Sequence, residues 1–370
     1  MKIQLDFQIV CLSLLLATLG LVAVGSATIY QTDGIVNAYT IRHSVYLVLA
    51  VCAFAAILFV PLELFERTHI PIYFVTLVLA LIVLLPWIGV VAGGGRRWID
   101  LGVFTLQVSE IARFLIPIYV AGHLARAHDK VQTSTIAAMK LPVWVGLVLL
   151  LFFFQPDFGS AVLIGLVVLG MMYLANVRYR DLFILGLIGS VGLLYIGYHR
   201  RDRIIAYFDT WTHAQDEGYQ LTQSLIGFGR GEFTGVGVGD GIQKLLYLPE
   251  PHNDFIFSMI VEETGFFGGA LVLCLLIWLV FRCFAIAKRA LAMEQRFAGF
   301  ISYGAGLMLG IQILINAGVA MGALPTKGLT LPFLSFGGNS LIVCAGLLAL
   351  VCRAYSEIQA VEAKNKNLNK

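Results

Sequence analysis

Ten long apolar segments constrain the fold of this 370-residue chain more than any other feature. A membrane-spanning helix needs about 20 mainly apolar residues, within a range of about 17–25. Because a lipid environment offers no partners to backbone N–H and C=O groups, such segments form helices. The segments therefore predict an all-α polytopic membrane protein with about ten transmembrane helices, at 7–30, 44–65, 71–92, 108–125, 141–154, 159–175, 181–198, 255–282, 298–321 and 334–352.

The composition excludes several other classes of protein. Hydrophobic residues make up 59% of the chain and charged residues 13%, against about 25% charged residues in soluble domains. These values exclude a soluble enzyme, a disordered chain and a secreted disulfide scaffold. The formal net charge of +3 is too small to indicate nucleic-acid binding. We expect a single transmembrane domain over residues 1–370.

The fifth and sixth apolar segments are short and share one break, QPDFG at 155–159. Proline and glycine end helices, so the break separates two elements. Two structures remain open from the sequence: a pair of helices joined by a tight hairpin, or a re-entrant pair.

The distribution of Lys and Arg predicts the orientation in the membrane. If the N-terminus is cytoplasmic, most of the 25 basic residues fall in cytoplasmic segments, and much of the remainder lies in one long outer loop, where charge counts little. Both termini are therefore expected in the cytoplasm, with residues 354–370 as a cytoplasmic tail.

The long outer loop, residues 199–254, lies between the seventh and eighth predicted helices. A loop longer than about 12–15 residues is usually functional or disordered. This loop is rich in aromatic residues such as Tyr207, Trp211 and Phe228, which argues against disorder. We expect it to pack back onto the helices or to enter the headgroup layer.

Ionisable residues in or beside the apolar segments are candidate functional residues, because charge inside a membrane is costly. Glu110 and Arg113 are three residues apart and can pair on one helix face, either as a packing ion pair or as part of a site. Asp254 opens the eighth helix, where it is either an N-cap or a reactive carboxylate. Glu262 needs a partner in the same helix or in its neighbours.

Three cations on the predicted outer side suggest a site for a lipid diphosphate. Arg97 precedes Trp98, Lys244 lies ten residues before Asp254, and Lys327 follows a Pro-Thr pair. Cations at the interface can bind phosphate groups, although snorkelling at helix ends is the simpler alternative. If the site exists, Asp254 and these cations face one outward-open cavity.

Seven glycines between 227 and 241 do not form a nucleotide-binding loop. They lack the GK[ST] ending and no strand precedes them. They instead permit sharp turns or a close approach of the backbone to another group.

Several motifs resemble the SEDS (shape, elongation, division and sporulation) polymerases. The similarity covers nearly the whole chain in the same order, and it rests on RWIDLG (97–102), SEIA (109–112), QPDFG (155–159), GVGVGDGIQKLLYLPEPHNDFIF (235–257), EETG (262–265) and NAGV (316–319). Within the family, LPTKGLTLPF (324–333) followed by SFGG (335–338) resembles the division-associated FtsW branch more than the rod-shape RodA branch.

This resemblance implies a glycosyltransferase that polymerises lipid II into glycan strands at the outer face of the bacterial cytoplasmic membrane, at the division septum. It implies Asp254 as the catalytic residue, a class B penicillin-binding transpeptidase and divisome proteins as partners, and no organic cofactor. A divalent cation, Mg²⁺ or Mn²⁺, could assist, with Asp254 as a ligand. Gln223 and Ser224 are expected to help bind the substrate. The residues expected to support the site are Trp98, Glu110, Arg113, Asp157, Glu250, His252, Glu262, Asn316 and Ser335.

Two other functions fit the sequence. Intramembrane charges and the broken pair around 155–159 would also suit a lipid II flippase or another transporter. A non-catalytic scaffold that recruits a transpeptidase is the third possibility. Against transport, the long aromatic outer loop suggests chemistry on one face.

Overall fold

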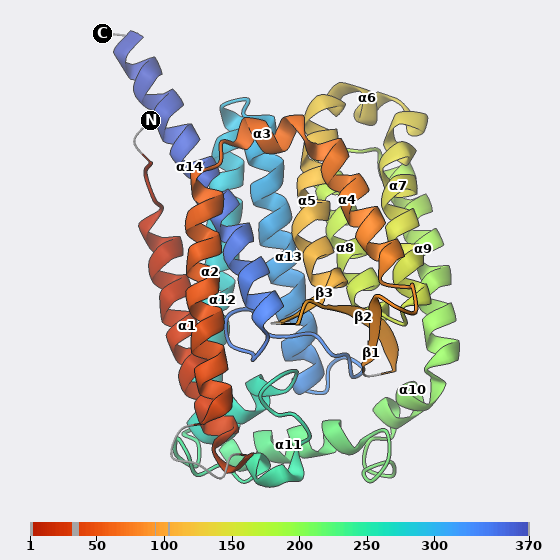
Figure 1. The fold of residues 1–370 in the computed structure, drawn as a ribbon, viewed down its shortest axis with the longest axis vertical. Coiled ribbons are helices and arrows are strands. Elements are labelled where there is room, and N and C mark those ends of the chain that lie inside the picture. Colours follow the sequence, from red (N-terminus) through yellow and green to blue (C-terminus); the bar gives the residue numbers. More distant parts are fainter. Residues whose placement is uncertain (1–2, 32–36, 93, 103, 369–370) are drawn as a thin grey trace.

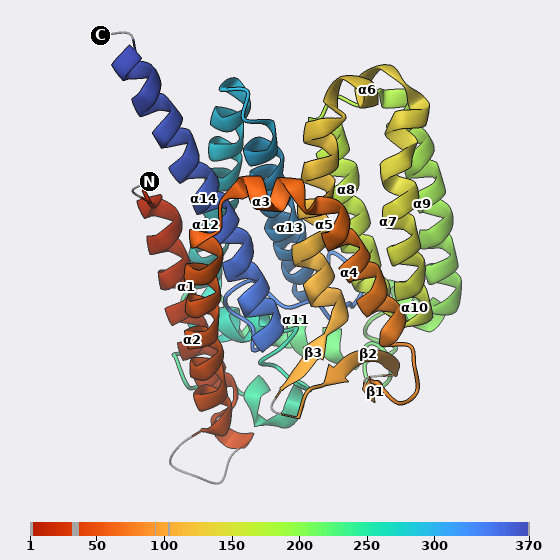
Figure 2. The same cartoon turned by 45° about the horizontal axis from the view of Figure 1, so that its top comes forward.

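The computed structural model describes residues 3–31, 37–92, 94–102 and 104–368, which form a helical bundle (Figure 1). Figure 2 shows α7, α8 and α9 grouped on one side and α1, α2 and α14 on the other. In chain order the elements are α1 (Phe7–Ala27), η1 (Ile29–Gln31), α2 (Ala38–Phe59), α3 (Leu62–Arg67), α4 (His69–Ile82), β1 (Gly89–Ala92), β2 (Gly95–Asp100), β3 (Thr105–Gln107), α5 (Val108–Arg126), α6 (His128–Thr133), α7 (Thr135–Phe154), α8 (Phe158–Leu174), α9 (Tyr179–His199), α10 (Arg201–Phe208), α11 (Tyr219–Gly231), η2 (Gln243–Tyr247), α12 (Ile256–Ala292), α13 (Arg296–Ala320) and α14 (Gly338–Leu368).

The predicted class, an all-α polytopic membrane protein, is confirmed. In the described part of the chain, eight helices are long and apolar enough to cross a membrane, and α4 and α8 are shorter apolar helices. Each of the ten apolar segments coincides with one of these helices over at least part of its length. The expected tail, 354–370, continues α14 to Leu368, and its last two residues lie outside the described ones.

Burial separates an inner set of helices from an outer one. In the apolar window of α5, 72% of the residues are buried, and α13 and α14 are similar, whereas in α9 only 6% are buried. A helix that is apolar but unburied in the protein is stabilised by lipid. The interior of the molecule is therefore α5, α13 and α14, with α9 at the periphery.

The third predicted helix, 71–92, is helical only in its first part, which corrects the sequence-based prediction. α4 ends at Ile82, and Gly89–Ala92 form β1 in a small antiparallel sheet with β2 and β3. Pro86 accounts for the difference, because proline lacks the N–H that a continuing helix needs. In this sheet Trp98 pairs with Val90 on one side and with Gln107 on the other. β3 leads directly into α5.

The fifth and sixth segments form two helices joined by a tight hairpin, which is the first of the two alternatives from the sequence. α7 ends at Phe154 and α8 begins at Phe158. Asp157 caps α8 by accepting a hydrogen bond from the Ser160 backbone N–H at 3.3 Å, a typical role for aspartate at an N-cap.

Helix α12 is interrupted at Gly265, whose φ of 70° and ψ of −171° are non-helical. The glycine-containing segment after α11 fills the interruption: the Val236 N–H donates to the Glu262 carbonyl at 3.0 Å, and the Phe266 N–H donates to the Glu232 carbonyl at 2.9 Å. A Cβ on Gly235 would lie 2.2 Å from the Glu263 carbonyl oxygen. The glycines thus permit a close backbone approach to α12, as the sequence suggested, and the partner is a helix.

We expect Gly265→Ala to destabilise the fold by roughly 2–3 kcal/mol, because this backbone conformation is nearly exclusive to glycine. The new Cβ would also lie 2.4 Å from the Gly235 nitrogen. Thermal unfolding in detergent measures the effect. Gly229→Ala on α11 is the matched control, since nothing lies within 4 Å of its Cβ position. Equal melting temperatures for the two variants would contradict this account of the interruption.

Candidate active site

Most of the predicted site residues gather at one end of the bundle, opposite the end where α1 starts and α14 finishes (Figure 1). This end holds the β-sheet, α10 and α11. Arg97 lies on β2, Asp157 in the α7–α8 turn, Asp254 just before α12, and Lys327 in the segment between α13 and α14.

Asp254 is half-buried, and contacts to its backbone hold it in place. The Asn316 side-chain amide donates to the backbone carbonyls of Asp254, at 2.8 Å, and of Leu329. A Cβ placed on Gly328 would lie 2.8 Å from Asp254 Oδ2. Gly328 is exposed, so the half-buried Asp254 carboxylate lies against a surface glycine, and a larger residue at that position would crowd it.

The surroundings of Asp254 raise its pKa to about 6. Burial is the main cause, because it disfavours the charged carboxylate; the nearby Glu250 acts in the same direction, and Arg113 opposes both. A carboxyl group with this pKa is ionised at neutral pH and is a stronger base than an ordinary aspartate. These are the properties of a general base.

Two of the predicted cations converge on the α7–α8 turn. Arg97 Nη1 lies 3.9 Å from Asp157 Oδ1, and Lys327 Nζ lies 5.9 Å from the centroid of the Phe158 ring. Lys327 belongs to the segment that covers Asp254 and directly precedes Gly328, the residue that lies against the Asp254 carboxylate. The pKa of Lys327 is lowered, first by burial and then by Arg200 and Arg203, while Asp157 opposes the shift.

Sequence reasoning missed Arg200 as a candidate. Its Cζ lies 5.8 Å from the centroid of the same Phe158 ring. In the sequence Arg200 and Arg203 are simply basic residues of a long outer loop, and a cation near a helix end is common. The tertiary packing of the α9–α10 junction against α8 is what brings them to the site.

The predicted ion pair between Glu110 and Arg113 is present and buried. Arg113 also donates to Ser160 Oγ at 2.9 Å, and Ser160 donates to Asp157 Oδ2 at 3.0 Å. A chain of polar contacts therefore runs from the interior helix α5 to the α7–α8 turn. This arrangement positions Asp157 and Arg113 beneath the candidate site.

The structure places Lys244 away from the Arg97 and Lys327 cluster, which differs from the expectation of one shared cavity. Its side chain is 1% exposed, and Nζ lies 2.9 Å from Glu263 Oε1 and 3.3 Å from Ser26 Oγ. Glu263 needs a counter-ion because it is buried, and η2 delivers Lys244 to it. Lys244 therefore pairs with α12 and is not accessible to a diphosphate in this conformation.

Three other predicted residues make structural contacts within the protein, and a fourth lies beside one of them. Glu262 accepts from Arg230 and from the Ile242 backbone N–H, both at 2.9 Å. Ser224 donates to the Ala320 carbonyl at 2.7 Å, and Gln223 is its half-buried neighbour on α11. The Ser335 hydroxyl accepts a hydrogen bond at 2.7 Å from the Leu331 backbone N–H.

His252 and Glu250 shape the segment before Asp254. The buried His252 ring lies 4.8 Å from the Tyr39 ring and 5.4 Å from the Phe336 ring, centroid to centroid. The side-chain amide of Asn253 donates to Glu250 Oε2 at 2.8 Å. Both contacts hold the segment at 250–253, which leads into α12. Trp98 lies in the small sheet, in β2.

The described residues contain no group of three or more His, Cys, Asp or Glu side chains that could hold a metal ion. A Mg²⁺ site commonly uses only one or two carboxylates together with substrate phosphates. Asp254, with the exposed Glu250 close to it, fits that smaller requirement.

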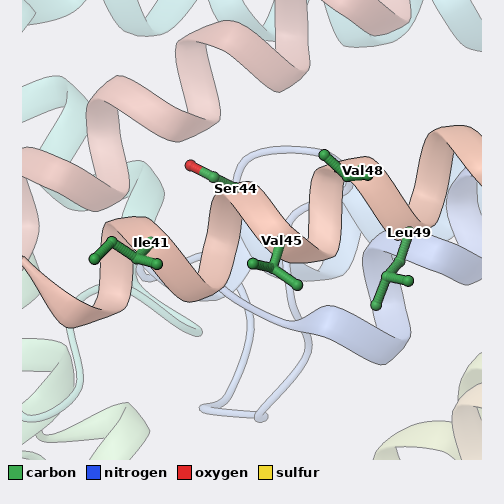
Figure 3. Close-up of a pocket in the computed structure, with 5 residues that line it drawn as sticks. All are labelled: Ile41, Ser44, Val45, Val48 and Leu49. Atoms are coloured by element: carbon green, nitrogen blue, oxygen red, sulfur yellow. The ribbon is translucent and has the colours of Figure 1, made fainter.

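Two hollows on the described surface are apolar and contain none of the predicted site residues. One, of about 370 Å³, follows a single face of α2 and is lined by Ile41, Val45, Val48 and their neighbours (Figure 3). The other, of about 250 Å³, lies between α1, α2 and α14 and reaches Phe333. Their linings suit hydrocarbon chains better than polar chemistry.

Comparison with known proteins is consistent across sequence and structure. The family model described as "Cell cycle protein" (FTSW_RODA_SPOVE) matches residues 7–359. The chain is 39% identical to the probable peptidoglycan glycosyltransferase FtsW of Methylomonas methanica, over 98% of this chain and 95% of that protein. It is 42% identical to the protein of the same name from Hahella chejuensis, over 95% and 90% of the two chains.

Solved structures have the same fold. A chain from the work described as "Structural coordination of polymerization and crosslinking by a peptidoglycan synthase complex" is 27% identical, with a TM-score of 0.79 over 96% of this chain and 99% of that one. The rod shape determining protein RodA of Thermus thermophilus is 27% identical, with a TM-score of 0.70 over 94% and 96%. Together with the site geometry and the family model, these likenesses show that the chain belongs to the FtsW/RodA/SpoVE family of cell cycle proteins, the SEDS family.

Proposed function

We propose that this chain is a peptidoglycan glycosyltransferase of the FtsW type, which polymerises lipid II into glycan strands for septal wall synthesis. The observation that carries the proposal is the position of Asp254, a half-buried carboxylate with a raised pKa that lies against the exposed Gly328. The relatives named probable peptidoglycan glycosyltransferase FtsW support the same reaction.

In the proposed reaction the glycan chain grows by one inverting displacement. Asp254 accepts the proton of the acceptor 4-hydroxyl while that oxygen attacks C1 of the donor sugar. The bond between C1 and the diphosphate oxygen breaks, and its electron pair leaves with the diphosphate. Cations at the α7–α8 turn, Lys327 and Arg97, stabilise the charge that develops there.

A divalent cation, if bound, would be held by Asp254 and Glu250 together with the diphosphate, and it would supply further charge stabilisation. The chain's own residues still orient the reacting groups. Asn316 fixes the backbone of Asp254, and the 324–337 segment covers it.

The prenyl tail of the lipid substrate lies among the helices in this proposal. The apolar hollow between α1, α2 and α14 is an example of the kind of groove between helices that a prenyl tail requires. With both termini in the cytoplasm, the site lies at the outer membrane face.

We also propose a class B penicillin-binding transpeptidase and other divisome proteins as partners, in the cytoplasmic membrane at the septum. The likeness to a chain of a peptidoglycan synthase complex supports a transpeptidase partner. Lipid II and the membrane are the other partners.

Purified protein in liposomes with labelled lipid II tests the function, with and without a purified transpeptidase. We expect glycan strands that lengthen with time and that lysozyme digests. Movement of labelled lipid II across the bilayer without any polymer would favour a flippase. A protein that stimulates its partner's cross-linking but neither polymerises nor moves lipid II would be a scaffold.

The pKa of Asp254 predicts an acidic limit to activity. The base must be deprotonated, so kcat/KM should fall about tenfold per pH unit below a midpoint near pH 6. An ordinary aspartate would place that midpoint near pH 4. Initial rates between pH 4.5 and 8 measure the profile, with unfolding followed in the same buffers. A flat profile down to pH 5 would contradict the role of Asp254 as the base.

A further inference from the structure

The junction between α9 and α10 brings basic side chains against one aromatic ring. Arg200 Cζ and Lys327 Nζ lie 5.8 Å and 5.9 Å from the Phe158 centroid, so the two cations are at most about 12 Å apart. They come from segments more than 120 residues apart in the sequence, and Phe158, at the start of α8, is nearly buried. The packing of three elements therefore creates this arrangement.

The charges at this ring do not balance within the neighbouring protein groups. Arg203, one turn further along α10, acts on Lys327 together with Arg200, and both disfavour its charged form. Asp157, the carboxylate that opposes this effect on Lys327, already accepts from Ser160 and faces Arg97. The negative charge of Glu217 favours the charged form of Arg203. The cations around the ring thus outnumber the carboxylates, which favours an added anion.

One hydrogen bond connects the cluster to the segment that covers Asp254. Tyr207 on α10 donates a hydrogen bond to the Ala323 carbonyl at 3.0 Å, which ties α10 to the α13–α14 segment. In that segment Lys327 is bonded to Gly328, whose Cβ position lies 2.8 Å from Asp254 Oδ2. The backbone of Lys327 is therefore adjacent to the residue that lies against the Asp254 carboxylate.

We propose that Arg200 and Arg203, together with Lys327, form the subsite that holds the diphosphate of the donor lipid, with Phe158 as its apolar floor. The proposal rests on the proposed function and assigns its leaving-group site to the α9–α10 junction. When the bond from C1 to the diphosphate breaks, the electron pair stays on the diphosphate oxygen. Arginine suits this role because its planar group forms two parallel hydrogen bonds to phosphate oxygens.

The subsite predicts selectivity for a diphosphate over a monophosphate. Cations on separate elements can each engage one of two linked phosphate groups, whereas a single phosphate reaches fewer of them. Binding is measured with the full chain carrying Asp254→Asn, to prevent turnover, in nanodiscs of phosphatidylcholine. The probes are farnesyl diphosphate, farnesyl monophosphate and inorganic pyrophosphate.

We expect Arg200→Gln with Arg203→Gln to weaken farnesyl diphosphate binding about 10- to 100-fold. Binding of farnesyl monophosphate should weaken only a few-fold. The pair Arg200→Lys with Arg203→Lys keeps the charge and should recover part of the affinity, which separates charge from folding. Melting temperatures within about 3 °C of the parent would show that the glutamine variants are folded.

Arg201→Gln is the control, because it removes one positive charge at a residue that lies between the two tested arginines in the sequence, next to Asp202. Arg201 is exposed and lies 3.6 Å from Asp202. An equal loss in Arg201→Gln, or parental affinity in the folded double glutamine variant, would overturn the proposal. So would competition by phosphatidylglycerol or free pyrophosphate as strong as that by the prenyl diphosphate, since either would show a general anion site.

These results separate failure of the subsite from failure of the proposed function. If the wild type polymerises lipid II but the glutamine variants bind the diphosphate normally, only the subsite is wrong. If the variants lose diphosphate binding but the wild type never polymerises, the subsite stands and the proposed reaction fails.

Discussion

Asp254→Asn is expected to lower polymerisation of lipid II by about 10²–10⁴-fold, because the amide cannot accept the proton of the acceptor hydroxyl. The substitution is nearly isosteric, and the backbone contact from Asn316 does not depend on the side chain. Initial rates of glycan synthesis from purified lipid II measure the loss, and substrate binding should change much less than the rate.

The same variant should not be less stable than the wild type. Because the pKa of Asp254 is raised in the folded protein to about 6, the protonated form is favoured there, and its contribution to stability is lost as the pH rises through 6. Asparagine removes that loss, so its melting temperature at pH 8 should equal or exceed that of the wild type.

Asp202→Asn is the matched control, since it makes the same change at an exposed carboxylate on α10. We expect normal polymerisation from it. Polymer formation by Asp254→Asn at more than about a tenth of the wild-type rate would remove Asp254 from the reaction.

Lys244→Met is expected to destabilise the protein by about 3–5 kcal/mol, because it leaves Glu263 buried without its counter-ion. Adding Glu263→Gln removes the unpaired charge, and the double variant should regain most of the lost stability. Thermal unfolding in detergent measures both. Arg67→Met provides the comparison: its partner Glu63 is exposed, so the effect should stay below about 1 kcal/mol.

The double variant also tests whether Lys244 contacts substrate. If Lys244 only pairs with Glu263, the double variant should polymerise lipid II at close to the wild-type rate. A variant with restored stability but a rate at least about tenfold lower would return Lys244 to the diphosphate site, through a conformation different from this one.

Several features of the fold and the site could be predicted from short stretches of sequence. The apolar segments gave the class of protein because the length and hydropathy of a spanning helix are local properties. The pairing of Glu110 with Arg113 follows from the pitch of one helix. The break before Phe158 and the cap at Asp157 also depend only on neighbouring residues.

Other features depended on packing between distant segments. The interruption at Gly265 is stable because residues 232–237 supply its hydrogen bonds, and no local pattern in α12 announces it. Lys244 looked like a surface cation, yet η2 buries it against Glu263. Arg200 looked like an ordinary loop residue, yet α8 brings it to the same ring as Lys327.

The sequence by itself determined that the chain spans a membrane and where its ten apolar helices lie, with both ends placed within about a turn for half of them, and that Asp254 lies just before one of them. Only the tertiary structure decided which cations surround the α7–α8 turn, that a glycine lies against Asp254 Oδ2, and which carboxylates are already paired. The physical reason is the distance along the chain over which each property acts. Hydropathy and helical periodicity act over a few residues, whereas the charge balance at a site depends on side chains that meet only when distant helices pack.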